Sequence, residues 1–197
     1  MSNISMTTSK RNAIVTVMLI SAFVSMLNQT ILNTALPAII KGLNITETTA
    51  QWLITGFMLV NGIMIPLTAF LMDKYSTRHL YIFSMAIFLI GSIVAAFSPT
   101  FTILMISRII QAIGAGILLP LMQFTVFTLF PAEQRGFAMG LAGVVVQSAP
   151  AIGPTLTGLF VDLFSWRMPF YLVSAIAAVA FILGFFFVEN NTKTKED

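Results

Sequence analysis

Six long apolar stretches run along the chain, and short polar segments separate them. They cover about residues 13–36, 50–72, 79–98, 101–128, 137–160 and 168–188. Each reaches the roughly 20 residues that an α-helix needs to cross a hydrocarbon core about 30 Å thick. The pattern predicts an all-α integral membrane protein with six transmembrane helices, together with polar tails at 1–12 and 189–197.

The composition supports a multi-pass membrane protein. Hydrophobic residues make up 57% of the chain and charged residues only 9%, whereas a soluble domain carries about 25% charged residues. The net charge of +3 does not indicate a nucleic-acid partner, because the lysines and arginines stand mostly at the ends of apolar stretches, where they set topology. The lipid bilayer is therefore the expected surrounding.

Several kinds of chemistry are disfavoured by the same composition. Cysteine is absent, which excludes disulfides and cysteine-based metal sites. No group of residues has the spacing of a metal site, so neither a metal nor a cofactor is expected. A membrane enzyme is disfavoured too, because His79, the only histidine, stands at a predicted helix start and no two carboxylates share a membrane face.

The basic residues between the stretches predict the orientation of the chain. With the N-terminus in the cytoplasm, seven cations fall on the inner side and two on the outer side, namely Lys10, Arg11, Lys74, Arg78, Arg135, Lys193 and Lys195 inside, and Lys41 and Arg167 outside. An excess of this kind marks the cytoplasmic side. We expect both termini in the cytoplasm and the protein in the cell membrane.

One charge falls inside a predicted span. Arg108 follows Phe101 by seven residues, which places it roughly 10 Å along the fourth helix. A charge at that depth costs about 3 kcal/mol or more and normally faces a bundle interior or a watery cavity. Gln111 falls on the same helical face. We interpret both as facing a cavity, and the alternative is an arginine that snorkels to the headgroups.

The first span carries a polar stripe. Its members at helical spacing are Ser21, Ser25, Asn28, Gln29 and Asn33. Polar side chains at this depth must face protein or water. Two interpretations stay open at this point, because the stripe could join neighbouring helices or line a pathway. Pro37 is expected to end this helix.

The fifth span is rich in small and helix-breaking residues. Gly140, Pro150, Gly153, Pro154 and Gly158 all fall within it. Small residues let helices approach closely, and prolines at midspan bend a helix and free backbone carbonyls. A hinge helix and a generic close-packed helix are both compatible with this pattern.

A charged turn follows the second span. Asp73, Lys74 and Arg78 place one carboxylate between two cations, and we predict a charge cluster that clamps helix ends in one conformation. The alternative is a solvated turn.

The residues of this turn recur after the fifth span. Asp73, Tyr75, Ser76 and Arg78 correspond at equal offsets to Asp162, Phe164, Ser165 and Arg167. The two turns are expected on opposite sides of the membrane. This pattern indicates that helices one to three and four to six are two inverted three-helix repeats.

Four segments together resemble a known family. They are Leu27–Pro37; Ala69–Arg78; the group Leu104, Arg108, Gln111, Gly114 and Gly116; and Gly140–Gly158 followed by Ser165–Arg167. In this order they resemble the major facilitator superfamily, and more narrowly its fourteen-helix drug:proton antiporter branch. The resemblance implies that Arg108 takes part in proton coupling and that substrate binds between two halves of a complete transporter.

The sequence also departs from the family pattern. Asn28 stands where the first-helix motif usually has aspartate, Ala69 and Ser76 replace glycines in the loop motif, and Ala149 and Thr157 replace glycines in the fifth helix. No carboxylate then falls within the six predicted spans. The resemblance implies proton-coupled antiport for a complete protein, yet this half supplies no membrane carboxylate for it.

The resemblance covers nearly the whole chain but only the N-terminal half of such a transporter. We expect export of small amphipathic compounds by alternating access, with the pathway lined by Asn28, Gln29, Asn33, Arg108 and Gln111. The expected partner is a second six- or eight-helix bundle or another copy of the chain. The alternative is a truncated membrane remnant that does not transport, or a half-transporter that needs a partner.

Overall fold

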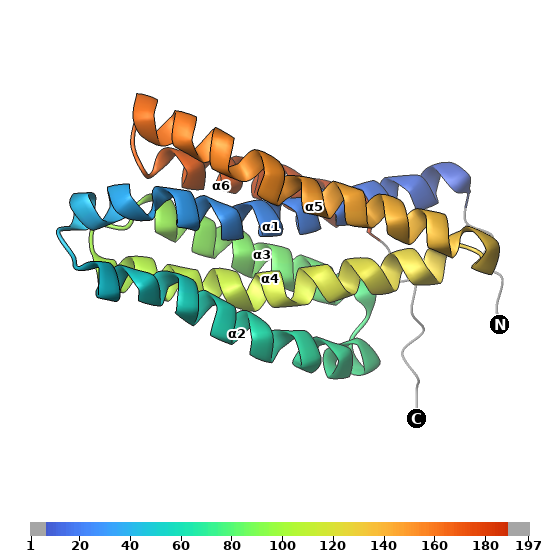
Figure 1. Ribbon diagram of the computed structural model, residues 1–197. Coiled ribbons are helices and arrows are strands. Elements are labelled where there is room, and N and C mark those ends of the chain that lie inside the picture. Colours follow the sequence, from blue (N-terminus) through green and yellow to red (C-terminus); the bar gives the residue numbers. More distant parts are fainter. Residues whose placement is uncertain (1–6, 189–197) are drawn as a thin grey trace.

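The computed structural model describes residues 7–188, and these form a bundle of six long helices (Figure 1). The helices are α1 (Thr8–Leu43), α2 (Glu47–Lys74), α3 (Thr77–Ala96), α4 (Phe101–Leu129), α5 (Ala132–Leu163) and α6 (Met168–Phe187). No strand occurs in this described part. All six are long and apolar enough to cross a membrane, which confirms the predicted fold class.

The first helix differs from the prediction at both ends. It includes residues 8–12, which were expected in the N-terminal tail, and it continues through Pro37 to Leu43. Pro37 removes only one backbone hydrogen bond at an exposed position, while the turn after it buries Ile39 completely. Burial of that side chain therefore outweighs the lost bond. The segments 1–6 and 189–197 lie outside the described residues.

The helix ends have local causes in the sequence. Asn44 ends α1 in the left-handed conformation, with φ at 52°, which asparagine tolerates better than most residues. The side chains of Thr46, Ser76 and Thr100 accept backbone N–H groups at the starts of α2, α3 and α4. Such caps satisfy donors that a helix start leaves free. They make α2 begin at Glu47 and α3 at Thr77, earlier than predicted.

Helix packing follows the two halves of the chain. α2 and α3 pack mainly on α4, α5 and α6 pack on α1, and α3 also packs on α6. Exchanging α1 with α4, α2 with α5 and α3 with α6 leaves this set of neighbours unchanged. α1 and α4 run in opposite directions at the centre, with α2 and α5 on opposite flanks (Figure 1). This is the arrangement expected of two inverted three-helix repeats.

Arginines at the two ends of the α3–α6 pair repeat the same symmetry. Arg78, at the start of α3, donates to the carbonyls of Val188 (3.1 Å) and Phe185 (3.0 Å) at the end of α6. Arg167, just before α6, donates to the carbonyl of Ser98 (2.7 Å) just after α3. Carbonyls at a helix end have no partner within the helix, and a cation there is favourable. The recurring turn sequence thus has a structural counterpart.

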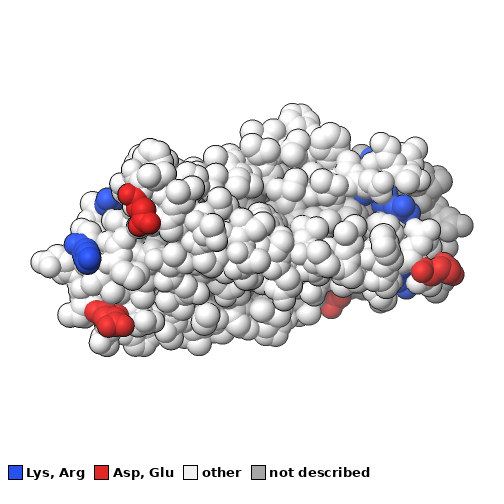
Figure 2. All heavy atoms as spheres, turned by 45° about the horizontal axis from the view of Figure 1, so that its top comes forward, with Lys and Arg blue, Asp and Glu red and all other residues white. Residues whose placement is uncertain are grey.

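Burial is uneven among the six helices. In an apolar 18-residue stretch of α1 and of α4, 56% of the residues are buried, whereas in such a stretch of α2 and of α5 only 22% are buried. Large exposed apolar residues on α2 and α5 include Leu59, Ile63, Phe137 and Val144. On the face shown in Figure 2, charged side chains gather toward the two ends and leave a broad uncharged middle. This surface suits lipid or another apolar protein face.

Candidate substrate pathway site

Arg108 lies in the interior of the bundle rather than at its surface. Only 1% of the residue is exposed. Its Nη1 donates to Gln111 Oε1 at 2.9 Å, and Gln111 Nε2 donates to Ser92 Oγ of α3 at 3.1 Å. Ser92 Oγ in turn donates to the carbonyl of Phe88 at 2.8 Å. The arginine therefore begins a hydrogen-bonded chain from α4 to α3, and snorkelling does not occur.

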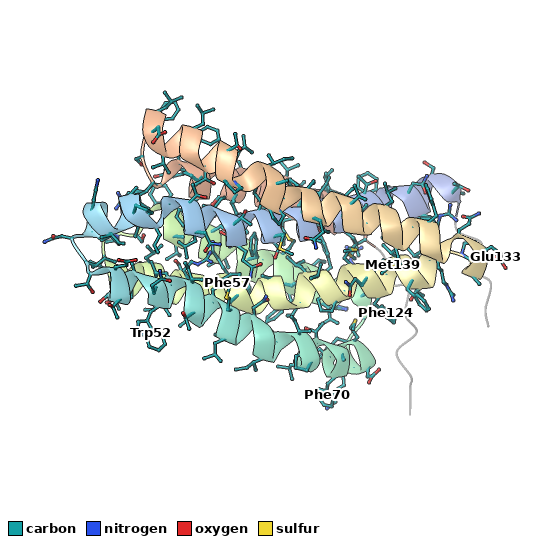
Figure 3. The ribbon with its side chains drawn as sticks, in the orientation of Figure 1. Trp52, Phe57, Phe70, Phe124, Glu133 and Met139 are labelled. Carbon is teal, nitrogen blue, oxygen red and sulfur yellow. The ribbon has the colours of Figure 1, made fainter. Side chains whose placement is uncertain are left out.

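An aromatic ring from α2 lies against the same guanidinium. The central carbon of the Arg108 guanidinium is 4.1 Å from the centre of the Phe57 ring. A cation over an aromatic face is attracted to it, by about 2 kcal/mol when both are desolvated. Phe57 points toward the middle of the bundle, whereas Trp52 and Phe70 of the same helix point outward (Figure 3). Phe57 offsets part of the charge without supplying an anion.

Buried polar groups on both central helices have no hydrogen-bond partner. They are Arg108 Nε and the side-chain amide of Asn28, for which neither Oδ1 nor Nδ2 is paired. Asn28 is fully buried on α1. An unpaired buried polar group costs about 1–3 kcal/mol. The region therefore retains unused hydrogen-bonding capacity from both central helices.

Asn28 and Arg108 lie near the same level of the bundle. Leu32 and Leu104 belong to one buried apolar cluster, and Ala22 and Ala115 line one cavity. Ser25 and Gln29, on either side of Asn28, line the same cavity as Phe57, whose ring contacts Arg108, so Asn28 lies near the level of Arg108. The polar stripe of α1 and the charge of α4 therefore occupy the same layer of the bundle.

A small cavity adjoins this layer. Its volume is about 40 Å³, which is room for one or a few water molecules. Its lining residues are Ala22, Ser25, Met26, Gln29, Phe57, Asn61, Ile65, Ala115 and Leu119. Phe57 thus contacts both the cavity and Arg108. The polar lining residues are Ser25 and Gln29 of α1 and Asn61 of α2. Asn61 Oδ1 is buried without a partner.

The structure brings some predicted pathway residues together and separates one of them. Asn28, Arg108 and Gln111 are buried, and Gln29 lines the cavity. Asn33 is exposed and does not line it. Phe57 and Asn61 were not among the predicted residues. Asn61 could have been found as an isolated amide in an apolar span, whereas nothing in the sequence distinguishes Phe57 from the other phenylalanines.

The charge cluster expected after the second span is not formed. Asp73 and Lys74 are exposed, and within residues 7–188 no ion pair joins Asp73 to Lys74 or Arg78. Lys74 Nζ lies 4.5 Å from the centre of the Phe70 ring. Arg78 contacts the end of α6 instead, because carbonyls without helical partners are available there. A role of Asp73 in conformational change stays a prediction.

The glycines and prolines of α5 differ in what they contact. α5 is one continuous helix that includes Pro150 and Pro154. A Cβ atom at Gly153 would come within 2.2 Å of Thr30 Oγ1 on α1, whereas Gly140 and Gly158 have nothing within 4 Å of that position. Gly153 therefore permits close packing of α5 on α1. A hinge at the prolines stays a prediction.

Comparisons with known proteins agree on one family. The profile of the Major Facilitator Superfamily matches residues 18–197. An uncharacterized MFS-type transporter, YcnB of Bacillus subtilis, is 50% identical over 186 residues, which is 94% of this chain and 39% of that protein. The lincomycin resistance protein LmrB of the same organism is 40% identical over 177 residues, covering 90% of this chain and 37% of LmrB. The chain spans less than two fifths of either relative.

Proposed function

Because the chain belongs to the Major Facilitator Superfamily of membrane transporters, we propose that it is the N-terminal bundle of an exporter. The exported compounds are small and amphipathic, and they move by alternating access. The names of two relatives support this direction of transport: lincomycin resistance protein LmrB at 40% identity and multidrug transporter protein MdtP at 32%. In the complete protein, export is coupled to protons.

The buried Arg108 is the observation that carries the proposal. Its guanidinium is held in place by Gln111 and Phe57, yet no carboxylate of the described residues pairs with it. Ionisable groups held inside membrane bundles are expensive and are found where substrates or ions pass. The unpaired amide of Asn28 near the same level adds a second polar group to this layer.

The transporting unit includes a second bundle. The relatives are more than twice as long as the matched part, and transporter sites of this type form between two bundles near the midplane. The polar cavity lies between α1, α2 and α4, while α2 and α5 expose apolar side chains. A second six- or eight-helix bundle, or another copy of this chain, fits such a surface.

Accumulation of lincomycin in cells tests the proposal. Three strains are compared: one with the chain alone, one with the chain plus the C-terminal remainder of the YcnB relative, and one with that remainder alone. We expect reduced accumulation only when both parts are present.

Two results would contradict this account. Export by the chain alone would show that it forms a transporter without a second type of bundle. Unchanged accumulation of lincomycin and of a panel of amphipathic drugs with both parts in the membrane would favour the alternative, a membrane protein that does not transport.

A further inference from the structure

A cavity separate from the pathway lies between the end of α2 and the start of α3. Its volume is about 450 Å³, and its lining residues are Leu71, Tyr75, His79, Leu80 and Phe83. Cavities that bind small molecules measure about 300–1,000 Å³. α2 packs along α4 while α3 also packs on α6, so the connected ends of α2 and α3 diverge (Figure 1). The cavity lies where these two helices separate.

The walls of the cavity are apolar and open toward the membrane. Leu71, Leu80 and Phe83 supply aliphatic and aromatic surface, and Phe83 is 53% exposed. These side chains lie in the last turn of α2 and the first two turns of α3, the level at which we expect hydrocarbon to meet the headgroups. A hydrocarbon chain therefore matches this surface better than a soluble ligand does.

The mouth of the cavity carries hydrogen-bond donors. Ser76 Oγ accepts the backbone N–H of His79 (3.4 Å) and lies 2.7 Å from His79 Nδ1. The serine can donate its own proton to Nδ1, which leaves the proton of a neutral ring on Nε2. Tyr75, also at the mouth, is 54% exposed. Hydrogen-bond donors thus come from both helix ends that line the cavity.

The turn beside the cavity carries a net positive charge. The turn contains Lys74 and Arg78 against the single carboxylate of Asp73. The first turn of α3 has no acidic residue, so the positive end of its helix dipole is not neutralised there. Basic pockets between transmembrane helices on the cytoplasmic side favour anionic headgroups.

From these features we propose that the α2–α3 cavity binds an anionic phospholipid. One acyl chain lies against Leu71, Leu80 and Phe83. The headgroup phosphate accepts a hydrogen bond from His79 Nε2, and the Lys74 ammonium, which lies beside the cavity over the Phe70 ring, turns from that ring to pair with the phosphate. Arg78, which is already bonded to the end of α6, adds positive potential without a direct contact.

Quenching by brominated lipids tests this site in the chain reconstituted into phosphatidylcholine vesicles. Bromine on an acyl chain quenches tryptophan fluorescence on contact. The probe is Phe83→Trp, and the matched control is Ile90→Trp on the same helix, since these positions are 53% and 54% exposed. Trp52 and Trp166, toward the other end of the bundle, give a common background that the parent chain measures.

Brominated phosphatidylglycerol and brominated phosphatidylcholine are added in separate titrations. At Phe83→Trp, half-maximal quenching is expected at a roughly fivefold lower fraction of the glycerol lipid, about the effect of one basic group near a membrane surface. At Ile90→Trp the two lipids should quench equally. Equal quenching at both positions would overturn the proposal and leave only general contact with the bilayer.

A second set of variants separates the headgroup contact from general surface charge. Adding Lys74→Gln and His79→Gln to the Phe83→Trp chain should remove the preference, while Lys41→Gln at the other end of the bundle should not. A preference that survives the double change would overturn the assignment. Phosphatidylglycerol retained by the purified parent chain, measured by native mass spectrometry, should fall with the same double change and gives a readout without an introduced tryptophan.

Discussion

α1 and α4 hold equivalent central positions in the two repeats, but a buried polar residue of each differs in its hydrogen bonding. On α4, Arg108 is held by a hydrogen bond to Gln111 and by the Phe57 ring. On α1, Asn28 is as deeply buried, and neither end of its amide has a partner. The α4 charge is held in a fixed position with only Nε unpaired, whereas the whole α1 amide is without a partner.

The hydrogen bond between Arg108 and Gln111 stabilises the fold, whereas the Asn28 amide forms no bond that would do so. A buried hydrogen bond to a charged group contributes about 1.5–3 kcal/mol, whereas an unpaired buried polar group costs about 1–3 kcal/mol. Gln111 is therefore expected to stabilise the bundle, and Asn28 to cost stability as long as its amide has no partner. A destabilising polar residue near the level of Arg108 is expected where a ligand, water or a second bundle supplies the partner.

Removal of the Arg108 partner should have the largest effect on stability. Gln111→Leu leaves the guanidinium without its carbonyl acceptor and breaks the bond to Ser92, so we expect a loss of about 2–3 kcal/mol in unfolding free energy. Reversible unfolding of the purified chain in detergent measures it. A loss below about 0.5 kcal/mol would show that Gln111 does not hold the arginine.

The close contact of α4 with α2 should be next in size. A Cβ atom at Gly116 would lie 2.4 Å from Met64 Cβ and 3.3 Å from the carbonyl oxygen of Asn61. Gly116→Ala should destabilise by about 1–3 kcal/mol, since overpacking forces the two helices apart. Gly62→Ala is the control, because nothing lies within 4 Å there. Equal unfolding midpoints for both variants would contradict the packing of α4 on α2.

A substitution at the corresponding contact of α1 with α5 should cost less stability. A Cβ atom at Gly153 would meet mainly the Thr30 hydroxyl group, at 2.2 Å from Thr30 Oγ1. That hydroxyl can rotate, although it then gives up its 2.9 Å hydrogen bond to the carbonyl of Leu27. Gly153→Ala should therefore cost about 1 kcal/mol, less than Gly116→Ala. A larger loss of unfolding free energy for Gly153→Ala than for Gly116→Ala would contradict this expected order.

The unpaired amide of α1 should show the opposite sign. Asn28→Leu replaces an unpaired polar group by an apolar one of similar size, and we expect a gain of about 1 kcal/mol in unfolding free energy. Export by the chain with its second bundle should nevertheless fall. A destabilised Asn28→Leu chain would indicate that the amide has a structural partner after all.

Asp73 should have the smallest effect on stability. Its carboxylate is exposed and has no ion-pair partner among the described residues, so Asp73→Asn should change the unfolding free energy by less than about 0.5 kcal/mol. Export should still fall if Asp73 acts in another conformation of the complete transporter. Export at the parent rate would exclude a conformational role of Asp73 and support the alternative of a solvated turn.

The sequence was sufficient for the helices because apolar length alone predicts membrane spans. It was not sufficient for the end of the first helix, which continues through Pro37 because burial of Ile39 outweighs the hydrogen bond that the proline removes. It placed Arg108 and Gln111 on one face by helical spacing, which the structure bears out. It could not reveal Phe57 as the partner of Arg108, or the contact of Arg78 with the end of α6, because both depend on how separate helices meet.

The proposed function of Arg108 is tested most directly by export from the chain together with the C-terminal remainder of the YcnB relative. Drug accumulation is compared for the parent, for Arg108→Ala and for Arg135→Ala, an arginine at the start of α5 that serves as a matched loss of charge. Equal amounts of each chain in the membrane are verified by immunoblotting. We expect Arg108→Ala to abolish export and Arg135→Ala to retain it. Export by Arg108→Ala at the parent rate would contradict the claim that the buried arginine is the functional centre of this bundle.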